Sequence, residues 1–356
     1  MSDFSRIDDS GVPELVKKYC ASSAPRGARM MAAQAMAPMP AQQQVLSLYQ
    51  LSFDADDEIA SVSIESAKNL PAAVLKQALP ATPHPGVLNF YATYHVASDI
   101  VQLIVLNPVV SGHTLARICA KTSNKQILVI ISNNQDRILS SPPIVTALYH
   151  NKYAPLSAVQ KVLELVVRNN VDLDGIPELD AIKQGILSSD GAMSASADST
   201  AQDECFDQVI AAGEKPAEES TRNLSSQQIK ELPLFAKVRL ATIGSSFHRS
   251  VLVKDRNRTV YMAAIRSPAV SEQEAIKFSG VKELEEDVIR YISTKREWHR
   301  NYSLKLNLVN NPKCPLPVAL KLLAHLRQND LRQIARSRSV PAVVARSAKQ
   351  AMLRRS

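Results

Sequence analysis

The chain has 356 residues, enough for two or three domains of ordinary size. Hydrophobic residues make up 45% of it and aromatic residues 5%, which predicts an aliphatic core, and only 10 glycines argue against an all-β or dinucleotide-binding fold. The formal net charge of +8 is unevenly placed: residues 221–356 hold 26 basic and 10 acidic residues, whereas residues 171–220 hold 12 acidic residues and two lysines.

Residues 1–45 are expected to form a mostly disordered, low-complexity N-terminus. The tract from Met30 to Gln44 consists largely of Ala, Met, Pro and Gln, with almost no charge and no helical period. Residues 12–20 suit a short amphipathic helix, which is either a docking motif or incidental. We expect neither a signal peptide nor a membrane span, because the chain starts with polar residues and no apolar run approaches ~18 residues.

Helical patterning begins at residue 46 and predicts a first array of helices over residues 46–172, in which residues 46–95 form a divergent first repeat. Residues 173–228 are acidic and rich in Ser, Ala and Asp, which predicts a flexible linker in which residues 205–212 suit a transient helix. Residues 229–356 are predicted to form a second, basic array. The predicted domain order is therefore tail, array, linker and array.

Two stretches of the chain repeat each other at an offset of about 160 residues, and each divides again at about 44 residues. One column of the repeat contains Asn107, Asn151, Ser267 and Asn311. Four residues further on, a second column contains Ser111, Pro155, Ser271 and Pro315. Serine there suits a helix N-cap, and proline suits the first helical turn. Each unit is predicted to turn at the first column and to begin a helix at the second.

Apolar positions after these turns recur at spacings of three and four residues, which is the period of one helix face. The segment 271–274 has the sequence of a capping box. A second helix follows in each unit, and a third, short helix is predicted over residues 303–309. The predicted fold class is all-α: an α-solenoid of repeats of about 44 residues, in two arrays joined by the disordered acidic linker.

The Asn/Ser-Pro turn followed by an apolar helix resembles the turns of HEAT-like, armadillo-type and leucine-rich-variant helical repeats. Residues 107–111, 267–271 and 311–315 carry the resemblance, and the stretch 237–352 is similar to a bacterial family of HEAT-like repeat proteins. The resemblance implies an α-solenoid in a bacterial cytoplasm, and it carries over no catalytic residue because its motif residues are structural. Lys152 stands where the other units have proline, so the turn of the second unit departs from the pattern.

Sequence motifs of enzymes are missing. There is no glycine-rich phosphate loop and no Gly-x-Ser-x-Gly elbow, and the seven histidines show neither i, i+4 pairs nor cysteine partners. The four cysteines lack metal or redox spacing and are expected to be reduced and structural. The acidic run at residues 283–287 suits a solvated helix start. We therefore predict a protein that is not an enzyme and has no metal site and no cofactor.

The clearest difference between the arrays is the basic and aromatic segment 295–302, which includes Trp298, the only tryptophan. Such a segment can stack a nucleic-acid base or hold phosphates, and the alternative is that Trp298 packs between adjacent units. Further basic residues near both ends of the second array either form a ridge that tracks phosphates or solvate helix faces. The candidate contact residues are Lys295, Arg296, Trp298, His299, Arg300, Tyr302, Arg256, Arg258, Arg332, Arg336 and Arg338.

The favoured function is a non-enzymatic scaffold or adaptor that binds protein partners on its solenoid surface. The alternative is the binding of nucleic acid or another polyanion by the basic second array. The acidic linker provides a further alternative, because it can fold back and screen that array. Protein partners and a cytoplasmic location are therefore expected, with nucleic acid as the second candidate, and no oligomeric state is predicted.

Overall fold

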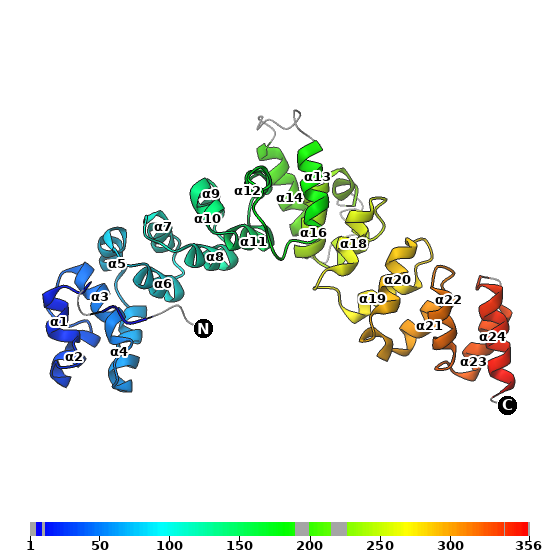
Figure 1. The fold of residues 1–356 in the computed structure, drawn as a ribbon, viewed down its shortest axis with the longest axis horizontal. Coiled ribbons are helices and arrows are strands. Elements are labelled where there is room, and N and C mark those ends of the chain that lie inside the picture. The colour runs from blue at the N-terminus through cyan, green and yellow to red at the C-terminus, as the bar shows by residue number, and fades with distance from the viewer. Residues whose placement is uncertain (1–4, 9–10, 189–198, 215–225, 338, 355–356) are drawn as a thin grey trace. The chain divides into compact units, whose positions relative to one another are not determined.

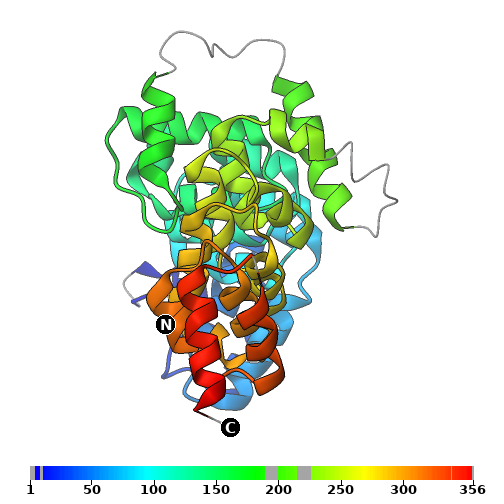
Figure 2. The same cartoon turned by 90° about the vertical axis from the view of Figure 1, so that its right-hand side faces the viewer.

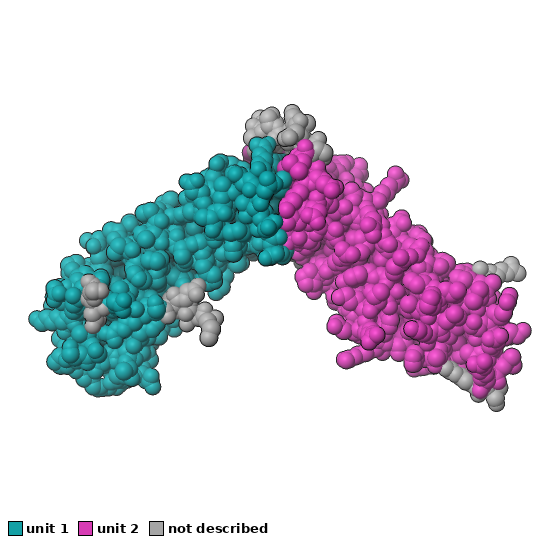
Figure 3. All heavy atoms as spheres, viewed as in Figure 1, with its two compact units in different colours: residues 1–175 teal, residues 176–356 magenta. Residues whose placement is uncertain are grey.

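The computed structural model of this chain is all-helical, as predicted, and the residues that it describes contain no strand. The described residues are 5–8, 11–188, 199–214, 226–337 and 339–354. The chain divides into two compact units, residues 1–175 and residues 176–356 (Figure 3).

The first unit consists of short helices that follow one another closely along the chain (Figure 1). They are α1 (Glu14–Cys20), α2 (Arg26–Ala33), α3 (Ala41–Leu51), α4 (Asp57–Lys68), α5 (Ala72–Ala78), the 3-10 helix η2 (Leu79–Ala81), α6 (Pro85–Tyr94), α7 (Ser98–Leu106), α8 (Gly112–Lys121), α9 (Lys125–Ser132), α10 (Gln135–Ser140), α11 (Pro143–His150) and α12 (Leu156–Arg168). Extended prolines stand directly before α1, α2, α3, α5 and α12, so the chain turns helical at the next residue.

The first 45 residues are not a disordered tail where the structure describes them. Helices α1 and α2 lie in this stretch, and α3 begins before its end. Val16 and Ala33 are buried in a core cluster with Leu51 and Ile59. The prediction of disorder was wrong because low charge and a missing period do not exclude helices in an alanine-rich tract. Alanine is the strongest helix former and is small enough to be buried where helices meet.

The later helices of the first unit form two rows. In one row α5 packs on α7, α7 on α9 and α9 on α12, and in the other α6 packs on α8 and α8 on α11. Ile104 of α7 and Leu128 of α9 are fully buried. Helices of this length are marginal in isolation, so burial of one apolar face against the neighbours supplies most of their stability. The sequence repeat of about 44 residues makes α7 and α11 equivalent positions of successive repeats, and these two helices belong to different rows.

The second unit also consists of helices that follow one another closely along the chain (Figure 1). They are α13 (Leu179–Ser188), α14 (Ser199–Glu214), α16 (Leu234–Ile243), α17 (Ser246–Leu252), α18 (Arg258–Arg266), α19 (Glu272–Gly280), α20 (Glu286–Thr294), the 3-10 helix η3 (Trp298–Arg300), α21 (Tyr302–Asn310), α22 (Leu316–Leu323), α23 (Gln328–Arg336) and α24 (Ala342–Leu353). Here α16 packs on α18, α18 on α20 and α19 on α21, while α24 packs on both α22 and α23. The short helix predicted over residues 303–309 is α21.

Two helices occupy much of the stretch predicted as a flexible linker. Helix α13 packs on α16 and α14 packs on α17, and both belong to the second unit. Ile182, Phe206 and Val209 are buried. The prediction of disorder is therefore wrong for these two helices, whereas residues 189–198 and 215–225 lie outside the described residues. The low average apolar content of the stretch concealed the few apolar side chains that one helix face needs.

The repeated asparagines tie together neighbouring helices of one row. Asn151, at the end of α11, donates from Nδ2 to the carbonyl oxygens of Cys119 and Thr122 at 2.5 and 2.8 Å, and both of these lie at the end of α8. Its Oδ1 accepts the backbone N–H two residues further on at 2.8 Å. Asn107 and Asn311 make the same contacts with the ends of η2 and α19. Each side chain satisfies carbonyls that a helix end leaves open and fixes its own turn.

Serine replaces asparagine at the third position of this column. Ser267 is buried, and its hydroxyl lacks a hydrogen-bond partner among the described residues. Arg249 instead satisfies the nearby helix end, because its Nη1 donates to the carbonyl oxygen of Gly244 at 2.7 Å. Its guanidinium also pairs with Glu274 at 3.0 Å. Glu274 and Ser271 close the predicted capping box at the start of α19.

The second column begins helices as predicted. Ser111 and Ser271 are the N-caps of α8 and α19, and each hydroxyl accepts the N–H of the third residue of its helix. Pro155 and Pro315 also occupy N-cap positions, one residue before the first turn in which proline was expected. Their extended backbone ends the preceding turn, so the helix starts cleanly after it.

Candidate functional site

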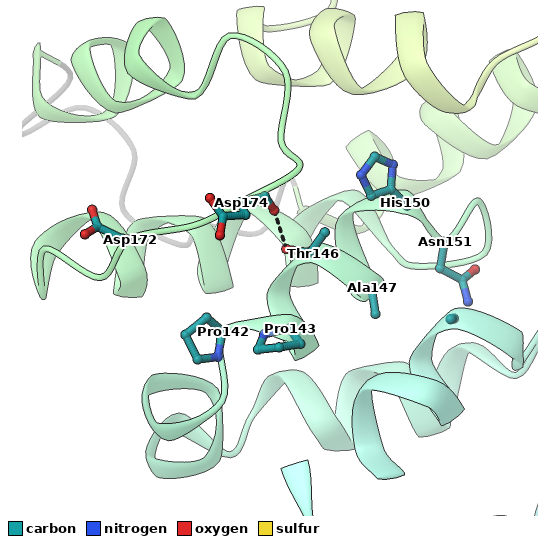
Figure 4. A pocket seen from close by; sticks show the side chains of 9 residues that line it. Pro142, Pro143, Thr146, Ala147, His150, Asn151, Asp172 and Asp174 are labelled. Atoms are coloured by element: carbon teal, nitrogen blue, oxygen red, sulfur yellow. Dashed lines mark hydrogen bonds between the residues drawn. The ribbon is translucent and has the colours of Figure 1, made fainter. Parts of the chain in front are cut away.

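The first unit contains an open groove with a volume of about 650 Å³ (Figure 4). Its walls come from the end of α8, from α11 and from the segment that follows α12. The lining residues are Ala120, Pro142, Pro143, Thr146, Ala147, His150, Asn151, Asp172 and Asp174. In Figure 4 the two prolines lie at one end of α11 and His150 at the other, with the segment that carries the aspartates running alongside.

Residues 171–175 form the strap that makes one wall of this groove. Thr146 donates from Oγ1 to the carbonyl oxygen of Asp174 at 2.9 Å. His150 donates from Nε2 to the carbonyl oxygen of Gly175 at 2.8 Å. Gly175 has φ +81°, a left-handed conformation that glycine adopts without strain. These contacts fix the strap along α11 and hold its carboxylates at the rim.

The side chains that line the groove suit the binding of another molecule. Pro142 and Ala147 give it an apolar floor, whereas Asp172 and Asp174 are exposed carboxylates. His150 engages the strap through Nε2, and the amide of Asn151 is committed to the end of α8. The polar side chains of α11 therefore shape the groove. It can desolvate an apolar side chain and attract a cation beside it.

The second unit contains a cluster of aromatic and basic side chains around Tyr291 of α20, which we call the Tyr291 cluster. The ring of Trp298 meets that of Tyr291 edge-on, with centroids 6.3 Å apart. The Lys295 ammonium lies 5.3 Å and the Arg266 guanidinium 6.0 Å from the centroid of the Tyr291 ring. The structure thus joins two of the predicted contact residues to Tyr291 and Arg266, which the sequence analysis had not placed with them.

Two other candidates have structural partners, and a third is half-buried. Arg258 pairs with Asp287 at 2.8 Å. The Tyr302 hydroxyl is hydrogen-bonded to Asp330, and the Arg327 guanidinium lies 4.8 Å from the centroid of its ring. His299 is half-buried, and this burial lowers the pKa of its imidazole. Arg258 and Tyr302 are therefore engaged in contacts within the chain.

The remaining candidates stand at the surface on separate elements. Arg296 and Arg300 are exposed on either side of Trp298. Arg256 is exposed in the turn between α17 and α18, and Arg332 and Arg336 are exposed on α23. Arg338 lies outside the described residues. Exposed positive charge is thus present both at the Tyr291 cluster and away from it.

Three cysteines are buried free thiols, and burial raises their pKa values. The values are about 12 for Cys20, about 12 for Cys119 and about 11 for Cys314. Such thiols are poor nucleophiles at neutral pH. Within the described ranges, no cluster of three or more His, Cys, Asp or Glu side chains is arranged to hold a metal ion. In the same part of the chain, no helix has the length and apolar character needed to cross a membrane.

Comparison with known proteins adds no assignment, because no family model, curated protein or solved structure matches the chain. Local sequence patterns could not reveal the groove, since its strap meets α11 only through the tertiary fold. The Tyr291 cluster left a weak signal. Tyr291, Lys295 and Trp298 are spaced four and three residues apart, which is a helical period, but nothing nearby indicated Arg266.

Proposed function

We propose that this protein is a non-enzymatic scaffold that binds extended segments of protein partners in the groove beside α11. The groove is the observation that carries the proposal, because it combines an apolar floor, a charged rim and a wall fixed by hydrogen bonds. Pre-formed grooves of this kind bind peptides with little reorganisation.

The same proposal extends to architecture and location. The two rows of short helices, and the asparagines that link neighbouring helices within a row, support an α-solenoid of the HEAT or armadillo type. In such a fold each repeat contacts its neighbours and the surface is left for partners. We place this scaffold in the cytoplasm, where buried free thiols such as those of this chain stay reduced.

The lining residues favour a peptide that carries a basic side chain next to an apolar one. The apolar side chain would lie on Pro142 and Ala147, and the cation would face Asp172 and Asp174. Exposed ion pairs contribute only about 0–1 kcal/mol each. The apolar contact therefore supplies most of the affinity, while the carboxylates orient the peptide.

A photo-crosslinking side chain at Ala147 of the full chain tests this function. We expect cross-links to a defined segment of a partner protein, and a synthetic peptide of that segment should bind the unmodified chain in solution. The matched control places the same crosslinker at Val129, an exposed side chain on α9. Equal capture of the same segments from both positions would contradict specific binding in the groove.

The substitution Ala147→Arg fills the floor of the groove and should weaken binding of that peptide at least ~10-fold, since it removes the central apolar contact. Val129→Arg adds the same charge elsewhere and should leave the dissociation constant unchanged. Asp174→Asn should weaken binding about two- to fivefold in low salt and less in high salt, because screening already weakens an exposed ion pair. If Ala147→Arg bound the peptide with unchanged affinity, the proposal would be contradicted.

The Tyr291 cluster favours a second function, the binding of single-stranded nucleic acid or another polyanion. Half-buried aromatic rings flanked by exposed Lys295, Arg296 and Arg300 combine stacking surfaces with phosphate-binding cations. Lys295 and Arg266 already lie over the Tyr291 ring, and Arg266 also pairs with Glu178 at 2.7 Å. We therefore place this function second.

Trp298 is the only tryptophan and provides a direct readout. Titration of the full chain with a single-stranded oligonucleotide should quench its fluorescence, with an affinity that falls steeply as salt rises. Replacing Lys295, Arg296 and Arg300 with glutamate should abolish the quenching, whereas Lys17→Glu with Lys18→Glu, in the first unit, should not. Salt-independent or absent quenching would rule out this second function.

A further inference from the structure

Helix α14 packs on the other helices of the second unit through a narrow stripe of buried side chains. In Figure 2 it is the green helix between the two grey traces. Among its described side chains, Phe206 and Val209 are the two that are buried, three residues apart on one face. This is how an amphipathic peptide occupies a groove on another protein.

The receiving surface consists of α16 and α17. Arg239 of α16 is fully buried, and its guanidinium carbon lies 5.2 Å from the centroid of the Phe206 ring. Arginine is among the residues least often buried completely. A cation–π contact stabilises it here, and an aromatic side chain on α14 provides that contact. The surface thus selects an aromatic side chain at this position of the bound helix.

His248 of α17 fixes how closely α14 approaches. Its Nδ1 accepts the N–H of Ser245 at 2.9 Å, so the neutral ring carries its proton on Nε2, which donates to the carbonyl oxygen of Val209 at 2.8 Å. Gly213 follows one turn later, and a Cβ there would lie 2.0 Å from Cε1 of the His248 ring. A glycine is therefore required at this contact.

Charge also favours a helix such as α14 on the surface of α16 and α17. Residues 199–214 contain four acidic residues and no basic residue, whereas residues 221–356 contain 26 basic and 10 acidic residues. Asp207 directly follows Phe206, and Asp203 precedes it by three residues. Opposite charge accelerates association and restricts the choice of partner helix.

We propose that the surface of α16 and α17 is a docking site for an acidic amphipathic helix of a partner protein, and that α14 is its resident internal occupant. The partner helix carries an aromatic residue, a β-branched residue three positions later and a glycine four positions after that. Because α14 is part of the same chain, its effective concentration is on the order of millimolar, and it limits binding of the partner. This site is separate from the groove of the first unit, so either proposal can fail alone.

The test uses a fluorescein-labelled peptide with the sequence of residues 199–214, with Cys205→Ser, titrated with the full chain. The chain variant Gly213→Ala should release α14 through the contact with His248 and bind the peptide at least ~10-fold more tightly than the unchanged chain. Phe206→Ala in the chain should do the same by removing the aromatic contact. Gln208→Ala alters an exposed position of α14 and should change nothing.

Two further measurements make the outcome decisive. Cys205 lies on α14 and is half-buried, whereas the other three cysteines are buried, so its reaction rate with a maleimide reports release of α14. We expect faster labelling in Gly213→Ala and Phe206→Ala, and at least ~10-fold weaker binding when the peptide itself carries Phe206→Ala. Faster labelling without tighter peptide binding would overturn the docking site. Unchanged labelling in both variants would overturn the displaceable occupant.

Discussion

At the scale of single residues, the repeated asparagines do more than form turns. Asn151 and Asn311 each join the end of one helix to the end of the preceding helix in the same row. A side-chain amide suits this role because it donates two hydrogen bonds and accepts others at once. Ser267 occupies the same position of the repeat without an amide, and its buried hydroxyl has no hydrogen-bond partner among the described residues.

The substitution Asn311→Ala should lower the free energy of unfolding by about 1–3 kcal/mol, because the carbonyls of Ser279 and Val281 lose their buried donor. Urea denaturation followed by circular dichroism measures the effect. Asn169→Ala is the control, since Asn169 is exposed and should change stability by less than ~0.5 kcal/mol. Equal effects of the two substitutions would show that the amide ties contribute nothing.

His84 gives the first unit a pH dependence. Its Nδ1 accepts the N–H of Gly86 at the start of α6, and burial lowers the pKa of the ring below its ordinary value of 6.5. The stabilisation by the neutral ring is therefore complete above pH 6.5 and is lost as the pH falls through the lowered folded pKa. His84→Asn keeps an N-cap oxygen. It should flatten the fall in thermal stability below pH 6.5, and a curve parallel to that of the unchanged chain would contradict this role.

At the scale of elements, α1 illustrates how weak the boundary is between a polar tail and a packed helix. Its sequence is short and carries two lysines, yet Val16 is completely buried while its neighbour Leu15 is 36% exposed. Average composition does not detect such an element, because one or two buried side chains decide whether it packs.

The pair Val16→Ala and Leu15→Ala tests whether α1 belongs to the core. Val16→Ala should cost about 1–2 kcal/mol of unfolding free energy, since it removes buried methyl groups and leaves a cavity. Leu15→Ala should cost less than ~0.5 kcal/mol. Thermal denaturation of the full chain provides both values, and a disordered N-terminus would show no difference between them.

At the scale of the whole molecule, the two compact units divide the chain at residue 175, so helix α13 and the acidic helix α14 belong with the basic array. A fragment of residues 176–356 should therefore unfold cooperatively, whereas residues 229–356 should be less stable because α16 loses its packing on α13 and the buried Arg239 loses its contact with Phe206. Thermal melting of the two fragments distinguishes them. Equal midpoints would mean that α13 and α14 contribute no stability.

The sequence alone determined the features of this protein that depend on neighbouring residues. Apolar spacing predicted the helices, the N-caps at Ser111 and Ser271 predicted where two of them begin, and missing motifs argued against enzyme chemistry. These signals act within one or two helical turns, so they survive without knowledge of the packing.

Only the tertiary structure decided which distant groups meet. It placed the strap of residues 171–175 along α11, Arg266 beside Tyr291, and α14 on the buried Arg239 and His248. None of these contacts follows from periodicity, because each joins side chains or carbonyls whose positions depend on how several helices pack. Residues whose composition predicted a linker form one wall of the groove and two packed helices, because a few of their apolar side chains are buried against neighbouring helices.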